Sequence, residues 1–347
     1  MKISKEKTRI SSIAFRIATA TSFFVAISAV AAVFLPNTAL GAERYVAMPI
    51  RALASFFSSL VSLPLFELLI LFLPIILMLL LVFIGKGSAR RAAESCILLL
   101  EALILLYSAS LVIPTAASYG RYIAPSATDV DYLGGIYALS VNLGESDFEL
   151  VGDFSEIKHG VLSAVEDYAK EEGIKYSPPA VKISLMPELL TAAGMLAHYS
   201  FISAEITLNG LQPAYMLAFT LAHEAAHFLG ITREDEANLF AFSALFESDF
   251  PFLRYSAALR GFEYLASPAY SLSREEYGLA YSRLSDFAKN DLIASSAFSE
   301  NLGHGRLGGI SSSINDSVIS MRDERGNSSY KNSAALIAAY LASRLGN

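Results

Sequence analysis

Hydrophobic positions follow two different patterns along the chain. In the first third, apolar residues form long, almost uninterrupted runs at positions 17–35, 65–84 and 92–114. Each run is long enough to cross a hydrocarbon core of about 30 Å as a helix. The pattern predicts an α-helical membrane anchor with three transmembrane helices over residues 1–116. A separate domain is expected over residues 117–347.

In the second part, apolar residues recur with helical or strand periods. Residues 154–172 are typical of an amphipathic helix, with Ser155 as the N-cap and Gly173 as the stop. Short strands are predicted at 181–185 and 201–208. Further helices are expected at 239–246, 252–265, 274–294 and 333–345. The domain is therefore expected to be a mostly α, α+β fold with a small edge sheet.

The distribution of basic residues predicts the orientation of the anchor. Lysines and arginines precede the first apolar run and lie between the second and third: Lys2, Lys5, Lys7, Arg9, Arg16, Lys86, Arg90 and Arg91. By the positive-inside rule the N-terminus is cytoplasmic, and three crossings leave the domain outside. The first run has an alternative interpretation as a signal peptide, because Ala39-Leu40-Gly41 offers small residues for cleavage. The sequence thus predicts a multi-pass protein of the cell membrane, in contact with the lipid bilayer, with an extracytoplasmic domain.

Composition narrows the class of protein. With 54% hydrophobic residues and a mean hydropathy of +0.45, the chain is more apolar than an ordinary soluble enzyme. Cys96 is the only cysteine, which excludes an internal disulfide and a thiolate zinc site. A net charge of −7 without a basic stripe argues against nucleic acid as a partner. No G-x-x-x-x-G-K-[ST] motif is present, so a nucleotide is not expected either.

The strongest chemical signal is His223-Glu224-Ala225-Ala226-His227, at the end of a predicted apolar helix. Positions i and i+4 share one face of a helix, so His223 and His227 can point two imidazoles at one ion. A catalytic zinc site takes three protein ligands and leaves a position for water. Glu224 is placed to act as the general base on that water. The predicted cofactor is therefore Zn²⁺.

The third ligand must come from beyond the motif. In an unbroken helix Glu234 would stand about 10 Å along the axis from His227, too far to share the ion. Gly230 permits a sharp reversal, after which a second helix can return an acid to the ion. Glu234 is favoured as the ligand, and Asp235 and Glu236 are the competing acids. Asn238, one turn after Glu234, is the candidate to orient a histidine from outside the ligand set.

The stretch HEAAHFLGITREDEANLFAF resembles zincin-type metallopeptidases of the gluzincin kind, in which H-E-x-x-H is followed by a glutamate and, four residues later, by Asp or Asn. The resemblance implies that Glu234 is the ligand and Asn238 its companion. The metzincin pattern is met only in part, because Arg233 stands where its third histidine belongs.

Nearly the whole chain resembles a bacterial domain-of-unknown-function family of multi-pass membrane proteins that carries this motif. The similarity is clearest in YVAMPIRALASFFSSLVSLPLFELL, FISAEITLN, HEAAHFLGITREDEANLFAF and FLRYSAALRGFEYL. This resemblance implies membrane anchoring and a zincin site, and it implies no substrate.

Five further residues are candidates for roles around the site. His198 and Tyr199 precede a predicted strand and could donate a hydrogen bond to a developing oxyanion. The resemblance to zincins implies that Glu205, on that strand, and Asn209, just after it, border the substrate cleft, with a strand-end turn as the alternative. Glu67 lies near the end of an apolar run, where an interfacial carboxylate is ordinary.

The leading hypothesis is a membrane-anchored zinc metallopeptidase that hydrolyses peptide bonds of a peptide or protein substrate on the extracytoplasmic side. Glu224 would take the proton from a water molecule bound to the zinc. The alternative is a non-catalytic zincin-fold binding or sensor module that signals through the membrane helices.

Overall fold

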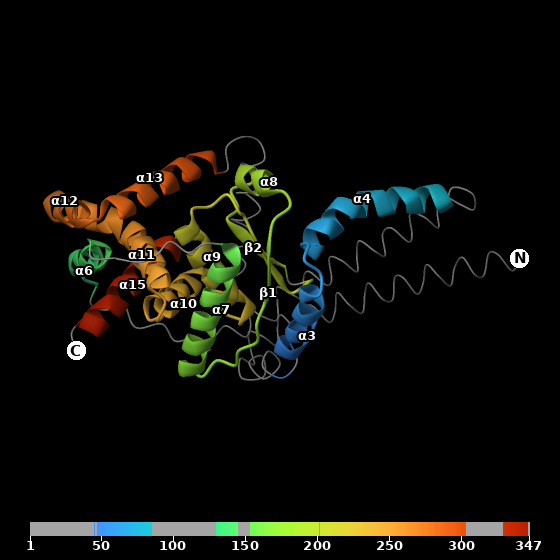
Figure 1. The fold of residues 1–347 in the computed structure, drawn as a ribbon, viewed down its shortest axis with the longest axis horizontal. Helices are drawn as coiled ribbons and strands as arrows, with labels where there is room; N and C mark the ends of the chain where they lie inside the picture. Colours follow the sequence, from blue (N-terminus) through green and yellow to red (C-terminus); the bar gives the residue numbers. More distant parts are fainter. Residues whose placement is uncertain are drawn as a thin grey trace, which may run out of the picture.

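The computed structural model describes residues 45, 47–84, 130–144, 153–200, 202–302 and 329–345. Over this part the chain is mostly helical and contains a three-stranded sheet (Figure 1). The helices are α3 (Met48–Ser59), α4 (Leu65–Ile84), α6 (Tyr132–Gly144), α7 (Phe154–Glu171), α8 (Pro187–Ala192), α9 (Ala214–Phe228), α10 (Glu234–Phe246), α11 (Pro251–Leu272), α12 (Arg274–Arg283), α13 (Asp286–Asn301) and α15 (Ser329–Leu345). The strands are β1 (Ala180–Ile183), β2 (Ala197–Ser200) and β3 (Glu205–Leu208).

The sheet has the order β1-β3-β2, with β3 parallel to β1 and antiparallel to β2. Paired residues of neighbouring strands point to the same face, and successive residues point to opposite faces. Lys182, Thr207 and His198 are therefore on one face, since Thr207 pairs with both of the others. The opposite face is apolar and carries Val181, Ile206 and Tyr199.

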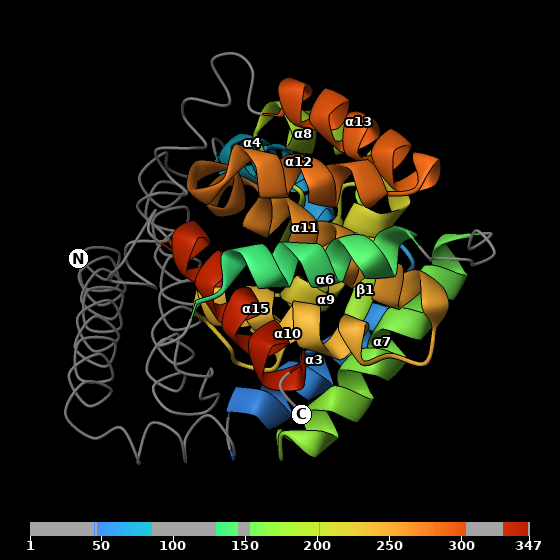
Figure 2. The same ribbon diagram turned by 90° about the vertical axis from the view of Figure 1, so that its left-hand side faces the viewer.

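The apolar face of the sheet lies against the helical core. The ring of Tyr199 packs edge-on to Phe228 of α9 with 5.7 Å between centroids. Helices α9, α10 and α11 contact one another, and α7 covers α9 and α10. Figure 2 shows α6 and α15 on the outer side of this group. Because α9 and α10 are surrounded by other elements, they are apolar almost all round, which explains the lack of a polar stripe on the motif helix.

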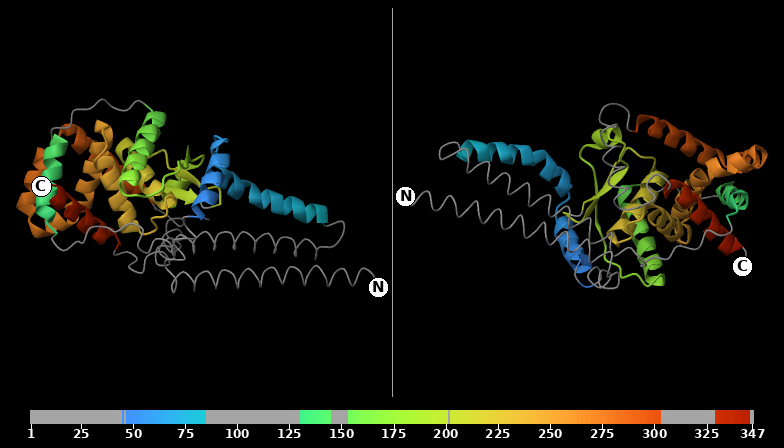
Figure 3. Two further views of the ribbon diagram at one scale, coloured as in Figure 1. Left: turned by 90° about the horizontal axis from the view of Figure 1, so that it is seen from below. Right: turned by 180° about the vertical axis from the view of Figure 1, so that it is seen from behind.

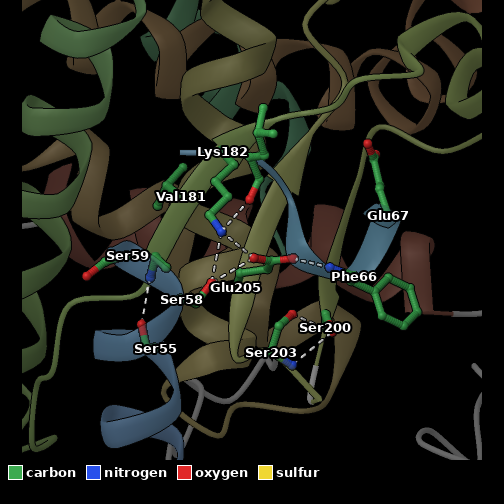
Figure 4. Close-up of polar contacts among 12 residues, drawn as sticks. Ser55, Ser58, Ser59, Phe66, Glu67, Val181, Lys182, Ser200, Ser203 and Glu205 are labelled. Carbon is green, nitrogen blue, oxygen red and sulfur yellow. Dashed lines mark hydrogen bonds and ion pairs between the residues drawn. The ribbon is translucent and has the colours of Figure 1, made fainter. Parts of the chain in front are cut away.

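The polar face of the sheet is covered by α3. Lys182 Nζ lies 2.7 Å from Glu205 Oε2, and both side chains are buried. Ser58 of α3 donates a hydrogen bond of 2.7 Å to the same carboxylate, and Ser55 Oγ accepts one of 2.7 Å from the backbone N–H of Ala180 (Figure 4). A buried charge pair is tolerated only when its remaining hydrogen bonds are made. These contacts make α3 part of the folded domain.

The prediction of a membrane anchor is wrong for the part of the chain that the structure describes. The apolar run at 65–84 forms α4, which extends away from the helical body (Figure 3). No helix in the described part of the chain is long and apolar enough to cross a membrane. The first turn of α4 belongs instead to the domain, because the N–H of Phe66 donates 2.7 Å to Glu205 and the side chain of Glu67 is buried. The runs predicted at 17–35 and 92–114 lie outside the described residues.

Several predicted elements are confirmed with different boundaries. The helix predicted at 154–172 is α7, but its N-cap is Asp153, whose side chain accepts from the N–H of Glu156. The helix predicted at 274–294 is divided into α12 and α13, because Ser285 caps a new helix by accepting from the N–H of Ala288. The strand predicted at 201–208 is reduced to β3, and β2 precedes it.

Helix α6 was not predicted, and it contains two adjacent glycines, Gly134 and Gly135. The structure gives a packing reason for Gly135 within the helix. A Cβ atom at Gly135 would lie 3.1 Å from the Leu265 side chain of α11, closer than ordinary contact. The glycine thus allows α6 to approach α11 closely, at some cost in helix propensity.

Candidate metal centre

The end of α9 is formed by a C-capping motif at Gly230. Gly230 has φ of +97°, a conformation that L residues with a side chain rarely adopt. The N–H of Ile231 donates 3.0 Å to the carbonyl of Ala226, and the N–H of Gly230 donates 3.0 Å to that of His227. This pair of bonds is the Schellman arrangement. The prediction that the motif helix stops at Gly230 is confirmed.

The same turn orients the second histidine of the motif. Nδ1 of His227 lies 2.7 Å from the carbonyl oxygen of Ile231. A carbonyl can only accept, so Nδ1 carries the hydrogen, and in the neutral ring Nε2 presents a lone pair. His223 lies one turn earlier, with 4.6 Å between the ring centroids and the ring planes nearly perpendicular. Both rings therefore lie on one face of α9.

The reversal after Gly230 brings Glu234, the first residue of α10, to these rings. Glu234 Oε2 lies 3.2 Å from His223 Nε2, and Oε1 lies 3.6 Å from His227 Nε2. One ligand atom from each of the three residues lies within 4.8 Å of the others. The structure thus brings His223, His227 and Glu234 together as a group that could hold a metal ion.

The three side chains are a group that could hold a metal ion, with one carboxylate oxygen of Glu234 facing each imidazole. The side chains of His223 and Glu234 are 15% and 24% exposed, so solvent reaches the cluster. Two imidazoles and one carboxylate are a donor set found in catalytic zinc sites.

Electrostatics in the cluster favour an ionised carboxylate. Burial raises the pKa of Glu234, but when the imidazoles are protonated the charge of His227 and hydrogen bonds from both rings lower it further, so the pKa lies well below its usual range. An ionised carboxylate is the form that coordinates a cation.

The competing acids after Gly230 are directed elsewhere. Glu236 Oε1 lies 3.1 Å from Nε of Arg233, and Asp235 Oδ2 lies 3.3 Å from an Nη atom of the same guanidinium. Asp235 also accepts from the N–H of Glu236 at 2.9 Å. Arg233 thus holds both acids, and neither belongs to the cluster formed by Glu234.

Within the described residues, the side chain of Asn238 makes its hydrogen bond to another helix and not to a histidine. Its side-chain amide donates 3.1 Å to Oγ of Ser333, on α15. The position one turn after Glu234 therefore fastens α15 to α10, and the orienting contact to His227 comes from the backbone of Ile231. Sequence patterns do not show this contact directly, although the Gly230 turn that creates it is visible in the sequence.

Glu224 lies beside the ligand set and is half-buried. Within the described residues its carboxylate makes no hydrogen bond to another side chain or to the backbone. A carboxylate without such a bond is available to a water molecule or a substrate. The arrangement can therefore combine a bound cation with a free base on one helix.

Residues proposed to border a substrate cleft occupy other positions. Glu205 is bound to Lys182 on the polar face of the sheet. Asn209 is buried and donates 2.8 Å to Thr191. Neither residue borders a cleft: Glu205 is buried in the central strand β3, and Asn209 directly follows β3 in a turn where its Oδ1 accepts 3.1 Å from the N–H of Leu211. The alternative of a strand-end turn therefore holds for Asn209. Of the two candidate oxyanion donors, Tyr199 packs on α9, whereas His198 faces Glu67 with 4.0 Å between Nε2 and Oε1.

Comparison with known families gives one match. A family model described as "Protein of unknown function (DUF3810)" matches residues 43–338. The chain belongs to the DUF3810 family. The DUF3810 match begins before α3 and ends within α15. Helix α3, which covers the sheet, and the candidate metal ligands therefore lie within the matched region. No curated protein and no solved structure matches the chain. Membership of DUF3810 confirms the resemblance to a family of unknown function, and any activity must be argued from the site.

Proposed function

We propose that this DUF3810 protein is a zinc-dependent metallopeptidase. The observation that carries the proposal is the approach of Glu234 to His223 and His227, at 3.2 and 3.6 Å, beside a glutamate that makes no hydrogen bond within the described residues. This combination supplies three ligands and a base, the minimum that metal-assisted hydrolysis requires.

Each residue of the site has a separate role in the proposed reaction. A bound zinc ion would polarise the scissile carbonyl and acidify a water molecule. Glu224 takes the proton from the attacking water and then gives it to the leaving amine. The carbonyl of Ile231 keeps His227 in the tautomer that binds a cation, and Glu234 supplies the negative ligand.

The sheet supports a peptide as the substrate class. β2 pairs only with β3 among the described strands, so its other edge is a candidate position for an extended peptide to pair. Helix α9 contacts β2, which puts that edge near the motif helix. An extended peptide that adds to a sheet edge gains backbone hydrogen bonds regardless of its side chains.

The test compares wild type with Glu224→Gln. Both proteins are loaded with zinc, their metal content is measured, and they are incubated with a broad peptide library. We expect one equivalent of zinc in each, with cleavage by wild type only. Gln keeps the size of the side chain but cannot take the proton, so retained zinc with lost turnover assigns the base.

Two results would overturn the peptidase. Wild type that holds zinc and cleaves nothing would indicate a zinc-dependent binding module. Wild type that holds no zinc would indicate an ion pair between Glu234 and the two histidines, which serves structure alone.

A further inference from the structure

The start of α4 contains a carboxylate that neither the metal cluster nor the ion pair of Lys182 uses. Glu67 is 4% exposed, and a buried carboxylate is costly unless hydrogen-bonded. Ser184 Oγ donates 2.5 Å to Oε1, and the N–H of Leu185 donates 2.8 Å to Oε2. Both oxygens are thus bound by residues that directly follow β1. Figure 4 shows Glu67 next to Phe66, at the side of the sheet that Glu205 occupies.

The same turn of α4 contacts the other two strands. The N–H of Phe66 donates 2.7 Å to Glu205 on β3. Glu67 Oε1 lies 4.0 Å from Nε2 of His198 on β2, and the Phe66 ring meets the imidazole edge-on at 5.3 Å. Two successive residues therefore connect α4 to the end of β1, to β3 and to β2. β2 is an edge strand that pairs only with β3 among the described strands. The contacts from α4 therefore restrain the position of β2 in addition to its pairing with β3.

His198 links this turn to the motif helix. Its side chain is 14% exposed, and Nδ1 makes no hydrogen bond within the described residues. Burial lowers the pKa of His198, and the charges of Glu224, Glu67 and Glu205 oppose that effect without cancelling it. The ring is therefore neutral at neutral pH and lies within the field of the proposed base. A carboxylate facing Nε2 favours the tautomer with its hydrogen on that atom.

We propose that Glu67 is a positioning residue for peptide hydrolysis: it fixes the Nε2–H tautomer of His198 and holds the edge strand β2 where an extended substrate pairs with it. The inference rests on the proposed function. The ligands and the base come from α9 and α10, whereas Glu67 acts on β2. Loss of its charge is thus expected to weaken substrate binding more than the chemical step.

The test variant is Glu67→Gln, which keeps the shape of the side chain and removes its charge. Its matched control is Glu188→Gln on α8, the same change at an exposed position on the connection from β1 to β2. In Glu67→Gln we expect unchanged zinc content, a nearly unchanged kcat and a KM raised about tenfold. Glu188→Gln is expected to behave as wild type.

A second readout does not depend on activity. Nitrogen-15 NMR of histidine-labelled protein reports the tautomer of His198, assigned with His198→Gln. We expect the Nε2–H form in wild type and a mixture of tautomers in Glu67→Gln. Hydrogen exchange of the β2 amides is expected to become faster in the same variant.

The outcomes separate the two proposals. A Glu67→Gln protein with the wild-type KM, His198 signals and β2 exchange overturns the positioning role. If that variant does not fold, Ser184→Ala removes one bond to Glu67 and is expected to raise KM and β2 exchange to a smaller extent. Zinc-loaded wild type that cleaves no peptide overturns the peptidase and the part of the Glu67 role that concerns hydrolysis. The NMR and exchange measurements then decide whether Glu67 holds His198 and β2.

Discussion

Nδ1 of His227 lies 2.7 Å from the carbonyl oxygen of Ile231, so the turn that ends the motif helix also sets the tautomer of a candidate metal ligand. The carbonyl takes this position because Gly230, between the two residues, adopts φ of +97°. Helix termination and ligand orientation therefore depend on one glycine.

Replacing Gly230 with alanine is expected to damage both stability and metal binding. A Cβ at this φ costs about 1–2 kcal/mol of folding free energy. Relief of that strain moves the Ile231 carbonyl, so zinc affinity is expected to fall about tenfold or more. Urea unfolding and zinc titration measure the two effects.

The control for this substitution is Gly278→Ala. Gly278 is exposed within α12, and a Cβ there would meet no atom within 4 Å. Alanine in such a position is expected to stabilise the helix by about 0.5–1 kcal/mol and to leave zinc affinity unchanged. Equal zinc affinities for the two variants would show that the turn does not orient His227.

Two neighbouring acids on α10 are expected to differ sharply in metal binding. Glu234→Gln removes the negative ligand and is expected to weaken zinc binding by more than about 100-fold. Glu236→Gln removes a partner of Arg233 and is expected to leave the zinc affinity near that of wild type. Competition with a chelator of known affinity measures both. If Glu236→Gln were the variant that loses zinc, the ligand assignment would be wrong.

Replacing Asn238 is expected to lower the stability of the protein and to leave its zinc affinity unchanged. Its amide bonds Ser333 of α15, so Asn238→Ala is expected to lower the free energy of unfolding by about 1 kcal/mol. Ser333→Ala should give a similar loss, and the double variant should lose less than the sum, because one bond is shared. Zinc titration of Asn238→Ala serves as the check. A large loss of affinity there would restore the role that the resemblance to zincins implies.

The buried pair of Lys182 and Glu205 is expected to make stability depend on acid pH. Burial raises the pKa of Glu205, but hydrogen bonds from Lys182, Phe66 and Ser58 lower it further, so the pKa lies below its ordinary value. An unfolded glutamate titrates near pH 4.3, so this stabilisation is complete above about that pH and is lost as the pH falls through the folded-state value. At pH 7, Glu205→Gln is expected to cost about 3–5 kcal/mol, since Lys182 remains charged and unpaired.

Urea unfolding of wild type and Glu205→Gln at several pH values measures this effect. The difference between the two proteins is expected to narrow on acidification, because a protonated Glu205 resembles Gln. The exposed pair of Glu166 and Lys170 on α7 is the control, and Glu166→Gln should change stability little at any pH, since solvent screens that pair. A constant difference between wild type and Glu205→Gln would contradict the assigned pKa direction.

The sequence by itself determined the local part of this protein. The spacing of His223 and His227 places two imidazoles on one helix face, and Gly230 ends that helix, since both features depend on a few neighbouring residues. Tertiary structure decided the rest. Glu234 approaches the imidazoles while Arg233 holds Glu236, which depends on how α10 returns after the turn.

Long-range partners account for the main errors of the sequence-based picture. Glu67 stands in an apolar run typical of a membrane helix, yet its carboxylate is bound by Ser184, which is 117 positions away. Asn238 bonds Ser333, 95 positions away. Hydropathy and motif spacing describe only residues that are close together in the sequence. A buried carboxylate or amide is instead stabilised by whichever polar group the fold brings to it.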